Sequence, residues 1–308
     1  MTTFLYTHPA CLEHDPGRHH PESPARLRAV LGALDDPEFA RLERREAPEA
    51  AHDDLLRNHP RRHVEHILDA VPKSGHIGID ADTILSPVSG AAALRAAGAV
   101  VAAVDAVVAK EAENAFCAVR PPGHHAEPER AMGFCLFNNV AIGALRAREV
   151  YGLTRVAVID FDVHHGNGTQ AAFETDSSLF YASTHQYPLY PGTGSASETG
   201  VGNIVNVPLR PMSGSNQFRL GVTQRILPAL DAFRPELVLI SAGFDAHQSD
   251  PLAQLLLEEG DYTWITEKLL EIAYRHADGR VVATLEGGYD LPALRASVAA
   301  HIRVLMSV

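Results

Sequence analysis

Residues 156–169 read Val156-Ala-Val-Ile-Asp160-Phe-Asp162-Val-His164-His-Gly-Asn-Gly-Thr169. The first four residues are apolar, which is typical of a parallel strand buried on both faces. In the extended backbone that follows, alternation places Asp160, Asp162 and His164 on one side. Two carboxylates together in a buried place resist ionisation unless a cation compensates their charge. The stretch therefore predicts a metal site just beyond the carboxyl end of a buried strand.

Most of the remaining chain alternates short apolar runs with Ala- and Leu-rich helical patterns. We expect strands at Ala115–Val119, Val156–Ile159, Ser178–Ala182, Ile204–Val207, Leu237–Ser241 and Val281–Leu285. We expect helices at Ser89–Ala109, Val140–Val150, Gln217–Phe233 and Asp261–His276. Apolar strands separated by helices predict an α/β protein with a single parallel β-sheet flanked by helices on both faces. No linker or repeat divides the sequence, so we expect one domain over residues 1–308, although no clear pattern precedes Gly78.

Polar residues follow five of these predicted strands, most of them close to a glycine. Ligands of open parallel sheets bind beyond the carboxyl ends of the strands, so we expect these residues to converge. Taken singly, each is more typical of a turn or a helix N-cap, and the prediction depends on their number. They are His124 with His125, the polar residues of 160–169, Ser183 with Thr184, Asp245, and Glu286 with Tyr289.

The residue types at these strand ends fit metal-dependent hydrolysis. A catalytic zinc takes three protein ligands and leaves a fourth position open. Asp162 and His164 are two candidate ligands, and Asp245 is the best-placed third. A ligand set without thiolates also accepts Fe²⁺, Co²⁺ or Mn²⁺, so the sequence favours zinc without fixing it.

Proton transfer and charge stabilisation need further groups. His124 and His125 follow a rigid Pro-Pro-Gly turn and can divide the roles of general base and general acid. Tyr289 can donate its hydroxyl to a developing oxyanion opposite the metal. Alone, a His-His pair is equally typical of a surface loop, and Tyr289 of a packing aromatic.

Six stretches in this order resemble the histone deacetylase family, specifically its class II and bacterial amidohydrolase members. They are Arg-Pro-Pro-Gly-His-His-Ala at 120–126, Gly-Phe-Cys-Leu-Phe-Asn-Asn at 133–139, the residues 160–169, Tyr-Pro-Gly-Thr-Gly at 190–194, Ser-Ala-Gly-Phe-Asp at 241–245 and Leu-Glu-Gly-Gly-Tyr at 285–289. His-Pro-Glu at 20–22, followed by Arg26, resembles the family's opening motif. The resemblance implies the arginase/deacetylase fold and zinc-dependent hydrolysis of an acylated amine.

The resemblance also implies two metal sites. Zinc would be held by Asp162, His164 and Asp245. A structural potassium beside it would be held by Asp160, Asp162, His164, Ser183 and Thr184, partly through backbone oxygens.

The same resemblance implies the catalytic groups. His124 would be hydrogen-bonded to Asp160 and His125 to Asn167, while Tyr289 polarises the scissile carbonyl. Class II members have Asn at position 167 where class I members have Asp, and a neutral Asn cannot stabilise an imidazolium as a carboxylate does. We therefore expect His125 to be the base that takes the water proton.

The expected substrate channel follows from the resemblance as well. Phe134 and Tyr190 would form its aromatic walls, with Gly133 beside Phe134. Leu252 occupies the position where polyamine-selective members can carry an acidic residue. A leucine offers no partner for a second ammonium, so we expect an acylated lysine peptide or a small acylated amine as substrate. Acetylpolyamine hydrolysis is the alternative.

Two other hypotheses about the function compete with a zinc-dependent deacylase. A protein of the same fold that binds acyl-lysine without turnover is one of them, although every expected catalytic position is filled. A two-metal manganese ureohydrolase is the other, and it needs additional Asp and His ligands in patterns that the sequence lacks.

The composition limits the classes of molecule that we expect this protein to bind. A net charge of −12 offers no basic face for nucleic acid and suits cationic ligands such as lysine-rich peptides or polyamines. The start lacks a signal-peptide pattern, and no uninterrupted apolar run approaches ~18 residues, so we expect no membrane partner. Three cysteines without a CxxC pair favour a reduced, cytoplasmic location. The sequence does not decide whether the protein forms a homo-oligomer.

The remaining histidines and cysteines receive structural interpretations. We expect surface or loop positions for the histidines of the N-terminal region, namely His8, His14, His19, His59, His63, His66 and His76. Cys117 and Cys135 are expected to be buried packing residues. Arg26 is expected near the floor of the site.

Overall fold

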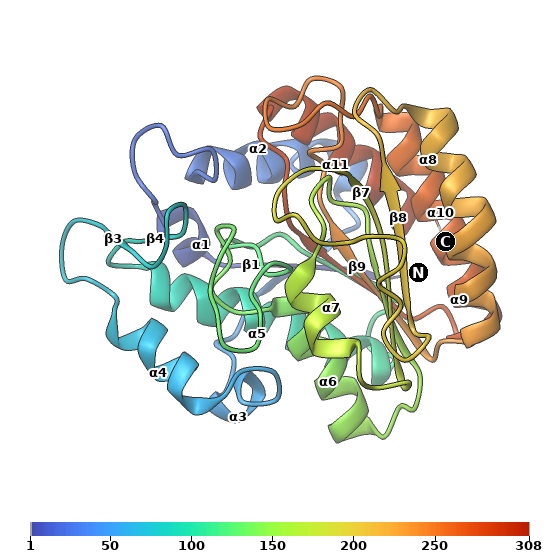
Figure 1. Cartoon of the computed structure of the whole chain (residues 1–308). Helices are drawn as coiled ribbons and strands as arrows, with labels where there is room; N and C mark the ends of the chain where they lie inside the picture. Colours follow the sequence, from blue (N-terminus) through green and yellow to red (C-terminus); the bar gives the residue numbers. More distant parts are fainter. Residues whose placement is uncertain (1, 308) are drawn as a thin grey trace.

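The computed structural model describes residues 2–307, and its centre is an eight-stranded sheet in which every neighbouring pair is parallel (Figure 1). The strands are β1 (Thr3–Thr7), β2 (Glu43–Glu46), β5 (Asn114–Cys117), β6 (Val156–Asp160), β7 (Leu179–Gln186), β8 (Ile204–Leu209), β9 (Leu237–Ala242) and β10 (Val281–Leu285). Their spatial order is β2-β1-β5-β10-β9-β6-β7-β8. A short antiparallel pair, β3 (Ile77–Gly78) and β4 (Ile84–Leu85), forms a second sheet.

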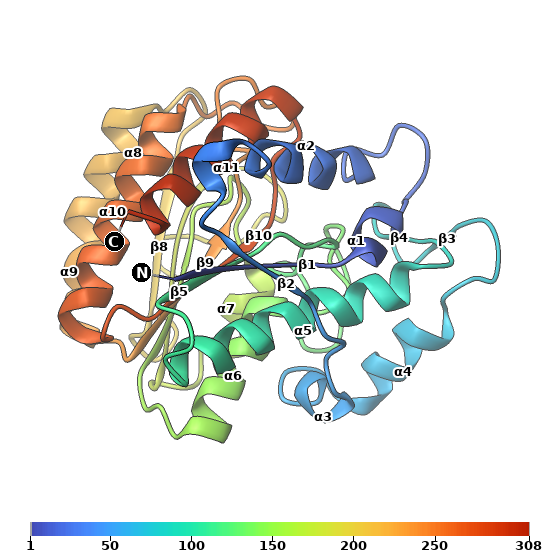
Figure 2. The ribbon, with the colours of Figure 1, turned by 180° about the vertical axis from the view of Figure 1, so that it is seen from behind.

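Helices cover both faces of the large sheet, which confirms the predicted fold class (Figure 2). One face packs against α1 (Pro9–Glu13), α5 (Ser89–Val108), α6 (Asn139–Tyr151) and α7 (Asn167–Phe173). The other face packs against α2 (Pro24–Leu34), α8 (Ser215–Gly221), the π-helix η2 (Val222–Ile226), α9 (Leu227–Phe233), α10 (Glu259–His276) and α11 (Leu291–Leu305). The short helices α3 (His52–Leu55) and α4 (Arg61–Asp69) lie outside these layers, while the 3-10 turn η1 (Pro37–Phe39) follows α2 and buries Phe39 in the main core.

Helix α5 is apolar on nearly all sides because it lies in the core. It is rich in alanine, and at Gly98 even a Cβ atom would overlap the backbone carbonyl of Pro48. Within residues 2–307 it is the one helix long and apolar enough to cross a membrane. We did not predict a helix of this kind from the sequence. However, 67% of that apolar window is buried inside the protein, as is typical of a core helix.

The predicted elements in the last two thirds of the chain are present, with shifted ends. The strand predicted to end at Ala182 continues to Gln186, so Ser183 and Thr184 lie within β7 and not after it. The predicted helix 217–233 is interrupted by η2, and Pro228 at the start of α9 lacks the N–H that a regular α-helical bond would need.

Two strands of the large sheet lie in the N-terminal region and were missed. β1 has the apolar sequence of a buried strand, but β2 reads Glu-Arg-Arg-Glu and is exposed at all four residues. It is an edge strand, where charged side chains are common and hydrophobic periodicity carries no signal.

Candidate metal centre and catalytic pocket

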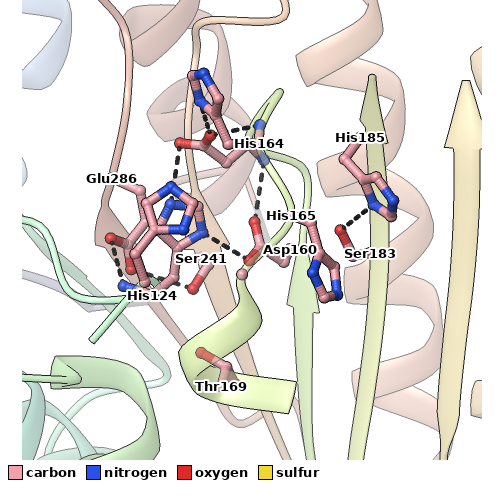
Figure 3. Close-up of polar contacts among 12 residues, drawn as sticks. His124, Asp160, His164, His165, Thr169, Ser183, His185, Ser241 and Glu286 are labelled. Carbon is pink, nitrogen blue, oxygen red and sulfur yellow. Dashed lines mark hydrogen bonds and ion pairs between the residues drawn. The ribbon is translucent and has the colours of Figure 1, made fainter. Parts of the chain in front are cut away.

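Five neighbouring strands carry the candidate site residues at one edge of the sheet. In the order β5-β10-β9-β6-β7, they contribute the loop with His124 and His125, then Glu286 with Tyr289, then Asp245, then 160–169, then Ser183 with Thr184. The sequence predicts the convergence but not this order. Figure 3 shows side chains from these strands meeting at the end of β6.

Asp162, His164 and Asp245 form a compact cluster of ligand atoms. One ligand atom from each lies within 4.8 Å of the others, and His164 Nδ1 is 3.2 Å from both Asp162 Oδ1 and Asp245 Oδ2. The backbone N–H of Val163 donates to Asp245 Oδ1 at 2.8 Å, and that of Gly287 donates to Asp162 Oδ2 at 2.8 Å. The carboxylates are therefore fixed in place by backbone amides from two loops.

The cluster fits a divalent cation. A Cβ atom at Gly243 or Gly287 would overlap the Asp162 or Asp245 carboxylate, so both glycines leave the space that these ligands occupy. Burial and the charge of Asp162 raise the pKa of Asp245 to about 7. Burial lowers the pKa of His164, but Asp162 and Asp245 outweigh it and raise the value to about 10. The field that would hold a proton on His164 is the field that favours a metal ion.

The two adjacent histidines have unlike hydrogen-bond partners, as the resemblance implies. His124 Nδ1 lies 2.9 Å from Asp160 Oδ2, and His125 Nδ1 lies 2.8 Å from Asn167 Oδ1. Burial lowers the pKa of His124, but the charges of Asp160 and Asp162 raise it well above its ordinary value. Burial and the neighbouring His124 lower the pKa of His125 well below its ordinary value. One ring therefore favours a proton and the other favours a free lone pair.

Glu286 fixes the backbone of this histidine pair. Its Oε2 accepts from the N–H groups of Gly123 and His124 at 2.7 and 3.2 Å, and its Oε1 accepts from the Ser241 hydroxyl at 3.1 Å (Figure 3). Glu286 is buried and connects the ends of β5, β10 and β9.

Tyr181 is a site residue that sequence reasoning missed. Its hydroxyl donates to Asp160 Oδ2 at 3.1 Å, the same oxygen that faces His124, and accepts from the Gly166 N–H at 3.0 Å. Tyr181 lies inside β7, where a buried aromatic is ordinary, so only the pairing of β6 with β7 reveals its partner.

A pocket of about 240 Å³ leads to the cluster. Its lining includes Phe134, Tyr190, Leu189, Leu252, Pro122, Asp82 and Tyr289, together with His124, His125 and His164. The predicted wall residues Phe134 and Tyr190 and the predicted Leu252 therefore all face this space. Leu189 and Asp82 were not anticipated.

The wall residue Phe134 is presented by a tight turn. Met132 and Cys135 form an antiparallel bridge, and the intervening Gly133 and Phe134 have φ of +57° and +69°. Two positive φ angles in a two-residue turn are those of type I′. A Cβ at Gly133 would lie 2.5 Å from His125 Cδ2, so glycine is required there for a second reason.

Asp82 and Thr83 hold this turn from the N-terminal region. Asp82 Oδ1 accepts from the Gly133 N–H at 3.2 Å, and Thr83 Oγ1 accepts from the Phe134 N–H at 3.1 Å. These residues lie between β3 and β4, whose two-residue strands give no sequence pattern.

Arg26 lies beneath Tyr289, in agreement with its expected place near the floor of the site. Its guanidinium carbon is 4.7 Å from the centre of the Tyr289 ring, and its Nε donates to the Gly288 carbonyl at 2.6 Å. Glu22 accepts from Arg26 at 3.0 Å and from Arg120 Nη2 at 2.7 Å. This fully buried ion cluster supports the loop that carries Tyr289.

Ser183 and Thr184, the potassium candidates of β7, are both buried. Ser183 is paired with Asp160 across β6 and β7, and its hydroxyl is 2.9 Å from His185 Nδ1.

The expectation of surface or loop positions for the N-terminal histidines was wrong at His63, which is buried within α4, while His14 and His59 lie in loops. His14, His59 and His63 are buried, while the other four are partly or fully exposed. His59 lies between the Pro128 carbonyl and the Asn138 N–H, and His63 contacts the Leu136 carbonyl. Buried imidazoles can satisfy backbone groups in a loop, which sequence position alone does not reveal. Cys117 and Cys135 are buried as expected.

The fold and the site together are those of the arginase/deacetylase class, a parallel sheet with a buried Asp–His–Asp cluster at its carboxyl edge. The family model for the histone deacetylase domain matches residues 20–305. The histone deacetylase-like amidohydrolase of Pseudomonas aeruginosa is 41% identical over 277 residues, covering 88% of this chain and 73% of that protein. A probable deacetylase of Archaeoglobus fulgidus is 39% identical over 298 residues, covering 94% of this chain and 82% of that protein.

A solved structure shows the same arrangement. The crystal structure of the HDA15 HD domain superposes with a TM-score of 0.94 at 35% identity, covering 99% of this chain and 88% of that one. The chain belongs to the histone deacetylase family. The family and the names of these relatives support a hydrolase of the deacetylase type.

Proposed function

We propose that this protein is a zinc-dependent deacylase that hydrolyses the amide of an acylated amine. The observation that carries the proposal is the compact Asp162–His164–Asp245 cluster at the end of an apolar pocket, beside two histidines with unlike partners. The cluster would hold the zinc ion. When bound, such an ion polarises the substrate carbonyl and lowers the pKa of a coordinated water to about 7.

The histidine pair divides the proton transfers in this proposal. His125, whose partner Asn167 is neutral and whose pKa is lowered by burial, accepts a proton from the attacking water. His124, held beside the Asp160 carboxylate, carries a proton and donates it to the leaving amine. Asp160 and Asn167 thus set opposite protonation states on adjacent rings.

Tyr289 acts as the hydrogen-bond donor to the carbonyl oxygen as negative charge develops there. Burial raises its pKa, and although the Arg26 charge lowers it, the net value stays well above the ordinary one. The hydroxyl therefore keeps its proton at neutral pH and can donate it in a hydrogen bond.

The apolar lining of the pocket favours a substrate whose acylated amine is carried on an alkyl chain. Phe134, Tyr190 and Leu252 surround it, and each buried methylene of such an arm contributes about 0.8 kcal/mol. Acylated lysine peptides and small acylated amines have this shape. One observation supports acetylpolyamines as the alternative substrates. Asp82 lines the pocket beside the turn that carries Phe134, and its carboxylate can pair with a second ammonium group.

Further properties belong to the same proposal. Residues 1–308 would form one catalytic domain, with a structural potassium near Asp160, Ser183 and Thr184. The protein would bind neither nucleic acid nor membrane and would work in the cytoplasm, and the net charge of −12 supports the first of these points.

The test is amine release from acetyl-lysine peptide, trifluoroacetyl-lysine peptide, acetylspermidine and acetylputrescine, with metal content measured in parallel. We expect turnover that favours the peptides, stops on chelation and returns with one equivalent of zinc. Turnover that favours polyamines would retain the chemistry and change the substrate class. A zinc-loaded protein that binds acyl-lysine peptide without any turnover would contradict the proposal and identify a binding protein.

A further inference from the structure

Asp250 is a buried carboxylate outside the metal cluster and without a part in the proposed chemistry so far. It is 7% exposed and lies in the loop that follows β9, five positions after Asp245. Its Oδ2 accepts from the Tyr289 N–H at 2.7 Å and from the Asp290 N–H at 3.3 Å. Its Oδ1 accepts from the Leu252 N–H at 3.0 Å. Backbone amides from two different loops therefore converge on one side chain.

Burying this carboxylate costs desolvation free energy, and an ordinary loop avoids that cost by leaving its carboxylates in solvent. A buried carboxylate loses its hydration, and among residues 2–307 no cationic side chain forms a direct salt bridge with Asp250, although the charge of Arg26 favours its ionised form. Its three amide contacts are what hold it. The loop would close at lower cost with a neutral polar side chain, so the charge points to a role in holding these amides firmly.

The Tyr289 backbone needs such an anchor. Tyr289 follows Gly287 and Gly288, and Gly288 has a φ of +126°, so these two glycines by themselves restrict the backbone little and contacts must fix it. Arg26 fixes the Gly288 carbonyl and lies against the ring from below. Asp250 accepts from the tyrosine's own N–H, so the two contacts together restrict the backbone that carries the ring.

We propose that Asp250 is a positioning residue that aims the Tyr289 hydroxyl and couples it to the channel wall at Leu252. The inference rests on the proposed deacylase function. The Asp250 carboxylate holds the backbone of Leu252, which lines the substrate pocket, and the backbone of Tyr289, which would donate to the substrate carbonyl. Changes that loosen this carboxylate should lower kcat more than they raise KM, because the hydroxyl acts mainly in the transition state.

A double-mutant cycle tests the coupling. Tyr289→Phe alone should lower kcat by about 10²–10³-fold, the usual cost of one oxyanion donor. Asp250→Ala alone should lower kcat by about 10- to 100-fold, because misplacement by about 1 Å has costs of this size. In the Tyr289→Phe background, Asp250→Ala should cost less than about twofold, since the hydroxyl it positions is gone. Equal costs in both backgrounds would overturn the proposal.

Two further variants separate positioning from folding. Asp250→Asn keeps an acceptor oxygen for one of the two loops, so its kcat should lie between those of Asp250→Ala and the native protein. Asp261 is the control, a buried carboxylate in the first turn of α10 that accepts from the Glu258 N–H and pairs with Arg219. Asp261→Asn should leave kcat and KM unchanged even if it lowers thermal stability.

A measurement without turnover keeps the inference distinct from the proposed function. Amide hydrogen exchange of the segment 287–291 should accelerate at least about tenfold in Asp250→Ala, since its protecting acceptor is lost. Exchange of the segment 121–126, held by Glu286, should not change. If the native protein releases no amine from any substrate, the deacylase proposal fails, yet this exchange still decides whether Asp250 holds Tyr289. Unchanged exchange at 287–291 would refute the positioning role.

Discussion

The guanidinium of Arg26 lies 4.7 Å from the centre of the Tyr289 ring. Arg26 also donates to the Glu286 and Gly288 carbonyls and is paired with Glu22, all without exposure to solvent. A side chain from the second helix of the fold thus holds the loop after its last strand. This contact joins the stability of the fold to the geometry of the site.

Replacing Arg26 with Met should therefore damage both. The change leaves Glu22 with one arginine fewer and should lower the free energy of unfolding by about 3–5 kcal/mol, as expected for a broken buried ion pair. It should also lower kcat, because the Tyr289 ring loses its support. Urea unfolding and amine release measure the two effects. Arg303→Met is the control, since Arg303 pairs with Glu38 on the surface and should change neither quantity appreciably. Native stability in Arg26→Met would contradict this account.

Tyr181→Phe should lower the rate and leave the metal site intact. The phenol hydroxyl is a hydrogen-bond donor to the Asp160 oxygen that faces His124, and its loss also leaves the Gly166 N–H without its acceptor. Loss of a buried hydrogen bond costs about 1–3 kcal/mol, so we expect about tenfold lower kcat. Zinc stoichiometry, measured by elemental analysis, should remain at the native value. Loss of zinc in this variant would show that Tyr181 acts on the metal cluster and not on His124.

An aspartate at position 167 should shift the pH dependence of the reaction. Asn167 Oδ1 faces His125, and its amide group donates to Glu127 Oε1 at 2.8 Å, so the clean variant is Asn167→Asp with Glu127→Gln. A carboxylate favours the protonated ring and raises the His125 pKa. The base then stays protonated to higher pH, and the acid limb of kcat/KM should move up by about one pH unit. Glu127→Gln alone is the control. An unmoved acid limb would assign the base to another residue.

Sequence reasoning placed those parts of the candidate site that are local in the sequence or that follow the end of a buried strand. Asp162 and His164 were predicted because alternation places them on one side of a short segment, and Asp245 because it follows another buried strand. Each relation is local or depends on a general rule of parallel sheets. The predicted strands and helices of the last two thirds succeeded for the same reason.

The missed residues depend on pairing between distant segments. Tyr181 has the sequence context of a core aromatic, and its role appears only when β7 is placed beside β6. Asp82 reaches the channel from a hairpin of two-residue strands, and Asp250 serves a loop 39 residues further along the chain. The order of the strands, which no periodicity encodes, decides these contacts.

Acid should destabilise the protein through buried histidines away from the metal cluster. Burial lowers the pKa of His59 to about 3, whereas histidine in an unfolded chain titrates near 6.5. Between these values the unfolded chain binds a proton that the folded protein does not. The free energy of unfolding therefore falls as the pH is lowered through this window, by up to about 1.4 kcal/mol per pH unit for each such group.

His59→Gln isolates this contribution. Urea unfolding at several values between pH 7 and pH 4 should give a shallower loss of stability in the variant, because every other titrating group is common to both proteins. The variant will be less stable at pH 7, since Gln replaces a ring that bridges the Pro128 carbonyl and the Asn138 N–H. Parallel pH profiles for the two proteins would contradict the shift.

Leu252→Glu should move substrate preference toward polyamines. Leu252 is half-buried in the pocket lining, and its N–H is held by Asp250, so a new side chain there projects from a fixed backbone position. A carboxylate at this place can pair with the second ammonium of acetylspermidine, and a charged hydrogen bond of this kind is worth about tenfold or more in affinity. The ratio of kcat/KM for acetylspermidine to that for acetyl-lysine peptide should rise accordingly and should fall again with added salt. Leu252→Gln, with the same length and no charge, is the matched control and should change the ratio little. If both variants shift the ratio equally, size and not charge selects at this position, and the proposed reason for preferring acyl-lysine is wrong.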